Sequence, residues 1–410
     1  MCGFVAKILI LIGAHLCTAP RPQKEADALT DAGHDVTIRG VWFNEDLAFR
    51  DQSIAKHRPW KFEPALDFRP QRRFTNLRVR LKTRLAKELY QKLGLFSPYL
   101  LGYGALALLR VARKANADLT IVHSEAGLWV GSRLLDEGFC VGVDFEDWFS
   151  EDLLLEDRVT RPVAYIKDLE NKLLKHCEYC LTTSHAMAKA MSQATNSEMP
   201  IAVYNAFPWS EREYIDGQIK DRRNPDLLSI HWFSQTIGSG RGLETLMAAL
   251  PYLTHPVEVH LRGNYPESSR QWLEPQIPKA WRQYIFIHPT VPNRELLSRI
   301  AEHDIGLALE PSNVLSTDLT ISNKLFQYLQ AGLAVVATDT SGQQEVFSQF
   351  PDCGALIPCQ SPKALADAIN TFLLNGDRLR SAKSAALVAA QALSWEQQSN
   401  RILDAVEGII

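Results

Sequence analysis

The chain has 410 residues, a formal net charge of −3 at pH 7, and 46% hydrophobic and 22% charged residues. This length exceeds one ordinary hydrophobic core and predicts two domains. The composition is that of a globular protein, and the nearly neutral charge gives no overall case for binding nucleic acid. Seven scattered cysteines, an odd number, favour a reducing compartment over a disulfide framework, so we expect a cytoplasmic protein.

The N-terminal segment predicts a strand over Lys7 to Ile12, a turn at Gly13 and a helix from Pro22 to Ala32. The turn lacks the G-x-G-x-x-G pattern, which argues against a dinucleotide-dependent dehydrogenase. Lys7 interrupts the apolar run and no small-residue cleavage site follows, so we interpret the run as a strand and not as a signal peptide. No apolar run reaches the roughly 18 residues that a membrane span needs.

Residues 69–92 are strongly basic and carry leucines at every fourth position. A helix would place these leucines in one stripe with basic residues beside it. Such a helix could lie on an anionic membrane surface, pack its stripe on the domain core as an ordinary surface helix, or bind nucleic acid. The leucines are Leu77, Leu81, Leu85 and Leu89, and the basic residues are Arg69, Arg72, Arg73, Arg78, Arg80, Lys82, Arg84, Lys87 and Lys92.

Two later strands deliver polar side chains to their carboxyl ends. One runs from Asp118 to His123 and is followed by Glu125, and the next delivers Asp144 and Glu146. The three carboxylates Asp144, Glu146 and Asp147 could bind a metal, act as an acid/base pair, orient an acceptor hydroxyl, or belong to a solvated loop. An isolated Asp-x-Glu-Asp sequence is a weak metal signature, so we predict no metal site.

A second sheet is predicted after a polar segment without periodicity, Pro208 to Pro225. Its first strand, from Leu227 to Phe233, leads into a glycine-containing loop that ends at Gly242, before a helix. Backbone N–H groups of such a loop can cradle a diphosphate, and the guanidinium of Arg241 suits phosphate.

The central stretch, His303 to Glu345, predicts strand, polar loop, helix and strand. Ser322 is placed to cap the helix and Gly332 to end it. Ligands of open α/β sheets bind beyond the carboxyl ends of the strands, so the loop from Glu310 to Ile321 is where a phosphorylated ligand would lie.

The sequence SNKLFQYLQAGLAVVAT, followed by Gly342 and Glu345, resembles the C-terminal signature of GT-B glycosyltransferases, in particular the retaining family 4. The resemblance implies an α/β fold with two Rossmann-like domains, whose parallel sheets face each other across a cleft, and a C-terminal helix that crosses back to the first domain. The predicted domains are 1–207, an acceptor domain on which 395–410 packs, a linker over 208–226, and a nucleotide-sugar domain over 227–394.

The resemblance also suggests site residues. His123 would approach the donor sugar, or would simply be a buried, hydrogen-bonded histidine, and Glu125 stands where many members have a second histidine. Arg241 and Lys324 would bind the diphosphate, and Gln235 stands where the family usually has another cation. These four, His123, Glu125, Arg241 and Lys324, are the predicted catalytic residues.

Further departures concern the ribose and the sugar. Gln327 occupies the position of the usual ribose-binding glutamate, and Leu319 that of a second glutamate, so Asp318 or Glu310 would have to reach the sugar hydroxyls. Glu345 is either a polar residue of the site or a helix-capping carboxylate. The predicted substrate-binding residues are Gly13, Asp144, Glu146, Gln235, Gly240, Gly242, Glu310, Asp318, Ser322, Gln327 and Glu345.

The expected activity is transfer of a sugar from a nucleotide diphosphate sugar to a hydroxyl, with retention, in polysaccharide or lipid-linked oligosaccharide biosynthesis. No cofactor is expected beyond this donor, the acceptor would be a saccharide or lipid-linked, and no nucleic acid is expected as a partner. An anionic membrane surface at residues 69–92 would make the enzyme peripheral at the inner face of the membrane. Two alternatives remain: a sugar-nucleotide epimerase of the same fold, and a non-catalytic binding protein.

Overall fold

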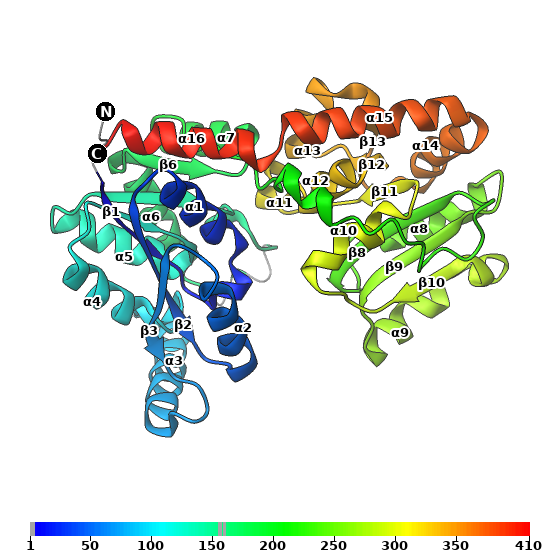
Figure 1. Ribbon diagram of the computed structural model, residues 1–410. Coiled ribbons are helices and arrows are strands. Elements are labelled where there is room, and N and C mark those ends of the chain that lie inside the picture. Colours follow the sequence, from blue (N-terminus) through cyan, green and yellow to red (C-terminus); the bar gives the residue numbers. More distant parts are fainter. Residues whose placement is uncertain (1–4, 155–157, 159–160) are drawn as a thin grey trace. The chain divides into compact units, whose positions relative to one another are not determined.

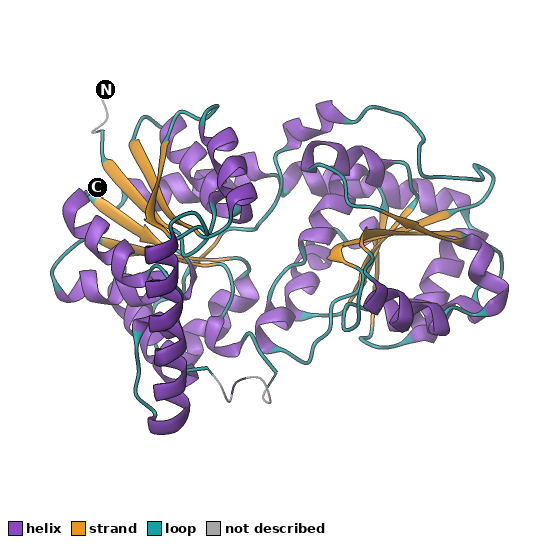
Figure 2. Ribbon diagram, turned by 90° about the horizontal axis from the view of Figure 1, so that it is seen from below, coloured by secondary structure: helices purple, strands orange, loops and turns teal. Residues whose placement is uncertain are grey.

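The computed structural model describes residues 5–154, 158 and 161–410. The chain forms two compact units, Met1–Val203 with Ser399–Ile410, and Tyr204–Gln398. Each unit is a parallel sheet with helices packed on it (Figures 1 and 2). Within the described residues, no helix combines the length and the apolarity that crossing a bilayer requires.

The first unit contains a seven-stranded sheet in the order β3-β2-β1-β4-β5-β6-β7, with all neighbours parallel. The chain reverses its direction of sheet growth between β1 and β4, so the loops after these strands open at a topological switch point. The strands are β1 (Lys7–Leu11), β2 (Asp35–Trp42), β3 (Lys61–Asp67), β4 (Leu119–Val122), β5 (Val141–Phe145), β6 (Tyr179–Thr182) and β7 (Ile201–Ala202).

Three helices of this unit end at a residue in the left-handed conformation. Asn116 and Asn196 close α4 and α7 with φ of 45° and 50°, and Gly94 closes α3 with φ of 68°. The Ser184 side chain caps α7 by accepting from the Met187 N–H at 2.9 Å. The helices are α1 (Pro20–Asp31), α2 (Glu45–Ala55), α3 (Arg73–Leu93), α4 (Ala105–Ala115), α5 (Ser124–Asp136), α6 (Val163–His176) and α7 (His185–Thr195).

The second unit contains a six-stranded sheet in the order β10-β9-β8-β11-β12-β13, again parallel throughout. Alternate residues of β12 enter two different hydrophobic clusters: Ala334 and Val336 join one, Val335 and Ala337 the other. Both faces of the sheet are therefore covered, which explains its continuous apolar strands. The strands are β8 (Ser229–Thr236), β9 (Glu258–Asn264), β10 (Ile285–His288), β11 (Ile305–Ala308), β12 (Ala334–Thr338) and β13 (Gly354–Ile357).

The helices of the second unit include one that the sequence interpretation missed. The predicted polar loop from Glu310 to Ile321 contains the short helix α11. Gly332, with φ of 79°, ends α12 as predicted. The helices are α8 (Leu243–Ala249), α9 (Glu267–Leu273), α10 (Asn293–Ala301), α11 (Leu315–Leu319), α12 (Asn323–Ala331), α13 (Ser341–Gln349), α14 (Pro362–Leu374) and α15 (Gly376–Ala392).

The last helix, α16 (Trp395–Glu407), begins in the second unit and continues in the first from Ser399 onward. The Trp395 N–H donates to the Phe207 carbonyl at 3.0 Å, and the Arg401 guanidinium donates to the Ala202 carbonyl at 2.8 Å. Two parallel α/β sheets and a returning C-terminal helix confirm the predicted fold class.

Candidate functional site

The second unit has a pocket of about 430 Å³ at the carboxyl ends of β8, β11 and β12. This is the edge of the sheet at which α/β proteins bind ligands. It is lined by Gly240, Gly242, Glu244, Thr245, Leu309, Glu310, Pro311, Thr338, Gln360 and Pro362.

The loop before α8 needs glycine for two reasons. Gly240 and Gly242 have φ of 72° and 80°, in the left-handed region, and a Cβ at Gly242 would lie 2.3 Å from that of Leu309. The Gly240 N–H donates to a Glu244 carboxylate oxygen at 2.8 Å, so this donor of the predicted phosphate cradle is already used. Arg241, between the two glycines, is exposed.

Glu310, which follows β11, organises the polar side of the pocket. Its Oε1 accepts from the Lys324 ammonium at 2.5 Å and from the Ser322 hydroxyl at 2.8 Å. Burial opposes ionisation of Glu310, but the charge and hydrogen bond of Lys324, the Ser322 hydroxyl and the charge of Arg241 keep its pKa below the ordinary value. Glu310 is thus an ionised carboxylate that fixes the position of Lys324.

This pairing modifies two predictions. Ser322 is at the N-cap position of α12, as predicted, but its side chain makes no capping bond, since the hydroxyl is directed to Glu310. Lys324 is not an isolated cation, because its charge is partly balanced by a carboxylate before any ligand binds.

Thr338 and Gln343 connect the carboxyl ends of the neighbouring strands β11 and β12, and the sequence interpretation missed both. The Glu310 N–H donates to the Thr338 hydroxyl oxygen at 2.8 Å, and the buried Gln343 amide donates to the Thr338 carbonyl at 2.7 Å. The available signal was the position of Thr338 as the last residue of β12 and of Gln343 in the first turn of α13, the helix that follows.

The other predicted residues of this unit lie apart from the pocket lining. Asp318 accepts from the Ser341 hydroxyl at 2.6 Å, and Glu345 accepts from the Tyr204 hydroxyl at 3.1 Å. Glu345 does not cap α13, whose N-cap is Thr340. Gln327 is half-buried and Gln235 exposed.

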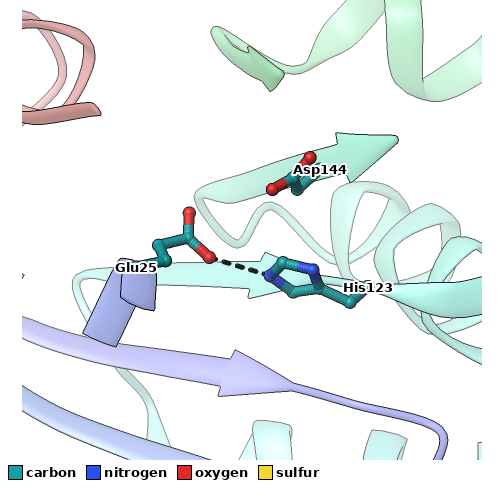
Figure 3. Close-up of side chains that lie close together, drawn as sticks. All are labelled: Glu25, His123 and Asp144. Carbon is teal, nitrogen blue, oxygen red and sulfur yellow. Dashed lines mark hydrogen bonds and ion pairs between the residues drawn. The ribbon is translucent and has the colours of Figure 1, made fainter. Parts of the chain in front are cut away.

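In the first unit, His123 at the end of β4 contacts two carboxylates, Glu25 and Glu146, and Figure 3 shows the contact with Glu25. Its Nε2 is 2.8 Å from Glu25 Oε2 and its Nδ1 is 2.9 Å from Glu146 Oε1. His123 and Glu25 are buried, whereas the Glu146 side chain is 34% exposed. Glu146 is therefore the solvent-facing member of a hydrogen-bonded chain whose other two members, His123 and Glu25, are buried.

The charge state of His123 follows from these partners. Burial alone would lower its pKa, but the hydrogen bonds of Glu146 and Glu25 and the negative charges around it raise the pKa to about 10. The ring is an imidazolium near neutral pH, and both N–H groups donate to carboxylates. In this state the ring has no free lone pair to accept a proton, and its Nδ1–H is hydrogen-bonded to Glu146.

Asp144, from β5, is paired with Arg21 of α1, whose Nε donates to Asp144 Oδ2 at 2.6 Å. Among the described residues, Glu25, His123 and Asp144 form a group whose ligand atoms lie within 4.8 Å of one another and could hold a metal ion. The Arg21 guanidinium already supplies a cation beside Asp144, and both nitrogens of His123 are hydrogen-bonded, so the donor set fits an ion-pair network better than a metal site.

Two other predicted residues have structural partners. Glu125 forms an ion pair with Arg161. The Gly13 N–H donates to the Ser124 hydroxyl oxygen at 3.1 Å, and a Cβ at Gly13 would lie 2.5 Å from that oxygen. Position 13, just after β1, therefore requires glycine, because any larger residue would clash with Ser124.

Sequence reasoning also missed Arg21, Glu25 and Tyr179, whose hydroxyl donates to Glu25. A signal was present, because Arg21 and Glu25 precede Leu29 at helical spacing, on the stripe that faces the sheet. Charged residues on a buried stripe indicate a paired internal network.

Comparison with known proteins places these features in context. Residues 231–375 match the family model described as glycosyl transferases group 1. No curated protein matches the sequence. Solved structures match nearly the whole chain. One is a glycosyltransferase from Rickettsia africae ESF-5, which is 13% identical, with 99% of both chains covered and a TM-score of 0.68. Another is sucrose-phosphate synthase from Thermosynechococcus elongatus, which is 14% identical, with 98% of both chains covered and a TM-score of 0.69.

A further similar structure is HepE from Anabaena in complex with UDP, with 16% identity, 98% of this chain, 100% of that chain and a TM-score of 0.66. At these identities the likeness shows the fold, which is GT-B. The family match covers β8 to the end of α14, the part of the chain that holds the pocket and the Glu310–Lys324 pair.

Proposed function

We propose that this chain, a GT-B enzyme of glycosyltransferase group 1 through residues 231–375, transfers a sugar from a UDP-sugar to a hydroxyl acceptor with retention of configuration. The observation that carries the proposal is the pocket at the carboxyl ends of β8, β11 and β12, with Arg241 and the Glu310-bound Lys324 beside it. The UDP complex of the structurally similar HepE supports the choice of base.

The donor diphosphate would contact two cations of different kinds. Arg241 offers an exposed planar fork for phosphate oxygens. Lys324 has three N–H donors, one of which is used by Glu310, so the others remain available for a phosphate. Because Glu310 holds the ammonium in place, little reorganisation would be needed when negative charge develops on the leaving diphosphate.

The acceptor would use the first unit. The Glu146 side chain is 34% exposed, is held by its hydrogen bond to His123, and can accept a hydrogen bond from a hydroxyl. We assign it to orientation of the acceptor, which would be a saccharide or a lipid-linked saccharide of polysaccharide or lipid-linked oligosaccharide biosynthesis.

The test is thermal unfolding of the purified protein with UDP, GDP or ADP. A ligand at a hundred times its Kd stabilises the folded state by about 2.7 kcal/mol, so UDP should raise the Tm and the other two should not. A response to GDP or ADP alone would replace the proposed base, and no response to any of the three would contradict the donor site.

A kinetic test addresses the residues. Arg241→Ala should raise the donor KM or lower kcat at least tenfold, because a charge-assisted phosphate contact contributes about 1.5–3 kcal/mol. Arg294→Ala, at another exposed arginine of the same unit, is the matched control and should leave both constants unchanged. Formation of a new sugar nucleotide without any acceptor would instead identify an epimerase.

A further inference from the structure

Helix α3 exposes a row of large apolar side chains. Phe74, Leu77, Leu81 and Leu85 follow one another at spacings of three, four and four residues, so they lie on one side of the helix. Their exposed fractions are 92%, 68%, 63% and 52%. Single exposed leucines are common, but a continuous row indicates an interaction surface.

The opposite side of α3 faces the unit. Val79, Thr83 and Ala86 are its buried residues, and Val79 packs in a cluster with Val41 and Phe68. The helix therefore packs through small and β-branched side chains, and the leucine row is directed away from the core. The alternative in which the stripe packs on the domain core is therefore wrong for Leu77, Leu81 and Leu85, whereas Leu89 is half-buried.

Exposed basic residues border the row. In the helical repeat Arg78 lies on one side of it and Arg84 on the other, while Lys92 continues its line toward the carboxyl end. Glu88, within the same helix, is the acidic exception and is paired with Arg84. The exposed basic residues of α3 are Arg73, Arg78, Arg80, Arg84, Lys87 and Lys92.

We propose that α3 binds an anionic lipid bilayer, with the row from Phe74 to Leu85 inserted among the lipids and the flanking basic residues on the acidic headgroups. An apolar row between cationic borders is the pattern of a helix lying in a membrane interface. In Figure 1, α3 lies at the edge of its unit beside β3, and the exposed fractions of the four side chains show that the row is accessible.

The charge pattern favours this occupant over two others. A second copy of the chain would place one basic border against another, which is unfavourable in a symmetric interface. An acidic protein or nucleic acid would use the cations but would leave the leucine row exposed. A bilayer with acidic headgroups satisfies both features.

The experiment is co-sedimentation of the full-length protein with vesicles of phosphatidylcholine alone or mixed with phosphatidylglycerol. The wild-type protein should pellet with the mixed vesicles, less at high salt, and should remain in solution with phosphatidylcholine alone. Equal pelleting with both vesicle types, or none with the mixed vesicles, would overturn the proposal.

Two triple variants test the apolar row and the basic residues of α3 separately. The first, Leu77→Ser with Leu81→Ser and Leu85→Ser, removes the apolar row and should lower the partition coefficient at least tenfold. Its matched control changes three exposed apolar residues elsewhere to serine and should pellet as the wild type does. The control positions are Phe49, Leu374 and Val388.

The second variant, Arg78→Gln with Arg84→Gln and Lys92→Gln, removes border charges and should lower partitioning about a hundredfold. The control with Arg282→Gln, Arg294→Gln and Arg378→Gln removes the same charge from exposed positions of the second unit. Wild-type pelleting by both α3 variants would assign membrane binding to another surface.

Sedimentation velocity without lipid provides the last readout. A dimer that is lost in the serine variant, with no vesicle binding by the wild type, would show that the row binds a second copy. Vesicle binding requires neither donor nor catalysis, so its outcome is independent of the proposed transferase activity. Unchanged Tm values for the variants would show that their folding is intact.

Discussion

The Nε2 atom of His123 lies 2.8 Å from a carboxylate oxygen of Glu25, and both side chains are buried. This contact determines the charge of the ring and, through the other ring nitrogen, the position of Glu146. The histidine that the sequence presents as a candidate catalytic residue is thus held between two carboxylates, and its catalytic role stays a prediction.

Replacement of Glu25 by glutamine should destabilise the protein by about 3–5 kcal/mol, because it leaves a buried imidazolium without one of its carboxylate partners. The pKa of His123 should fall, which NMR titration of the imidazole would measure. Tyr179→Phe is the control, since it removes only the hydroxyl that also bonds to Glu25. An unchanged His123 pKa in Glu25→Gln would show that the pair does not set the charge.

The raised pKa of His123 predicts a loss of stability in alkali. The folded pKa is about 10 and the ordinary value 6.5, so the folded state holds this proton more tightly than the unfolded state. Its contribution is fully present below pH 6.5 and is lost as pH rises toward about 10. Urea unfolding across this range should show a steeper decline for the wild type than for His123→Gln, and parallel curves would contradict the assignment.

The second unit should lose stability in acid rather than in alkali. Four buried histidines lie in contact, with His260 Nδ1 3.0 Å from His288 Nε2 and the His231 and His303 rings stacked at 4.7 Å. Burial, and then the charge of Arg262 and neighbouring imidazoles, lowers the pKa of His231, and burial foremost lowers that of His288 to about 4.

Because these folded pKa values lie below that of an unfolded histidine, the unfolded state takes up protons first as pH falls. The histidine contribution to stability is present above pH 6.5 and is lost progressively toward about pH 4. His288→Gln should lose less stability than the wild type between these values in urea titrations. An equal loss would show that His288 does not contribute to acid sensitivity.

Gly242→Ala should abolish UDP-dependent stabilisation and lower the Tm. The new Cβ would lie 2.3 Å from Leu309 Cβ, and the φ of 80° disfavours alanine, so we expect a loss of about 1–3 kcal/mol or more. Gly238→Ala, in the same loop with no heavy atom within 4 Å of its Cβ and no positive φ, is the control. Equal behaviour of the two variants would refute the packing argument.

The sequence was sufficient for the fold because alternation of apolar strands and amphipathic helices directly specifies a parallel α/β sheet. Gly332 correctly predicted the end of helix α12, because a helix that ends in the left-handed conformation favours glycine at that position whatever its tertiary contacts. The helical period of the α3 leucines was also correctly identified. Which side of α3 the unit would cover was not predictable, because that depends on Val41 and Phe68, which are distant in the sequence.

The candidate site was less predictable, since pairing in space determines its chemistry. Lys324 could be identified as a cation, but its partner Glu310 comes from the end of a different element. Likewise His123 could be placed at the end of β4, but its charge depends on Glu25 of α1 and Glu146 beyond β5. Hydrophobic periodicity carries no information on such pairs.

The division of the chain also affects the order in which it can fold. Residues Ser399–Ile410 belong to the unit that otherwise ends at Val203, with the whole second unit between them in the sequence. During translation the first unit emerges from the ribosome long before this segment, in which Arg401 reaches the Ala202 carbonyl, has been synthesised. The unit whose synthesis begins first is therefore the one completed last, because its closing segment, Ser399–Ile410, is made only after the whole second unit.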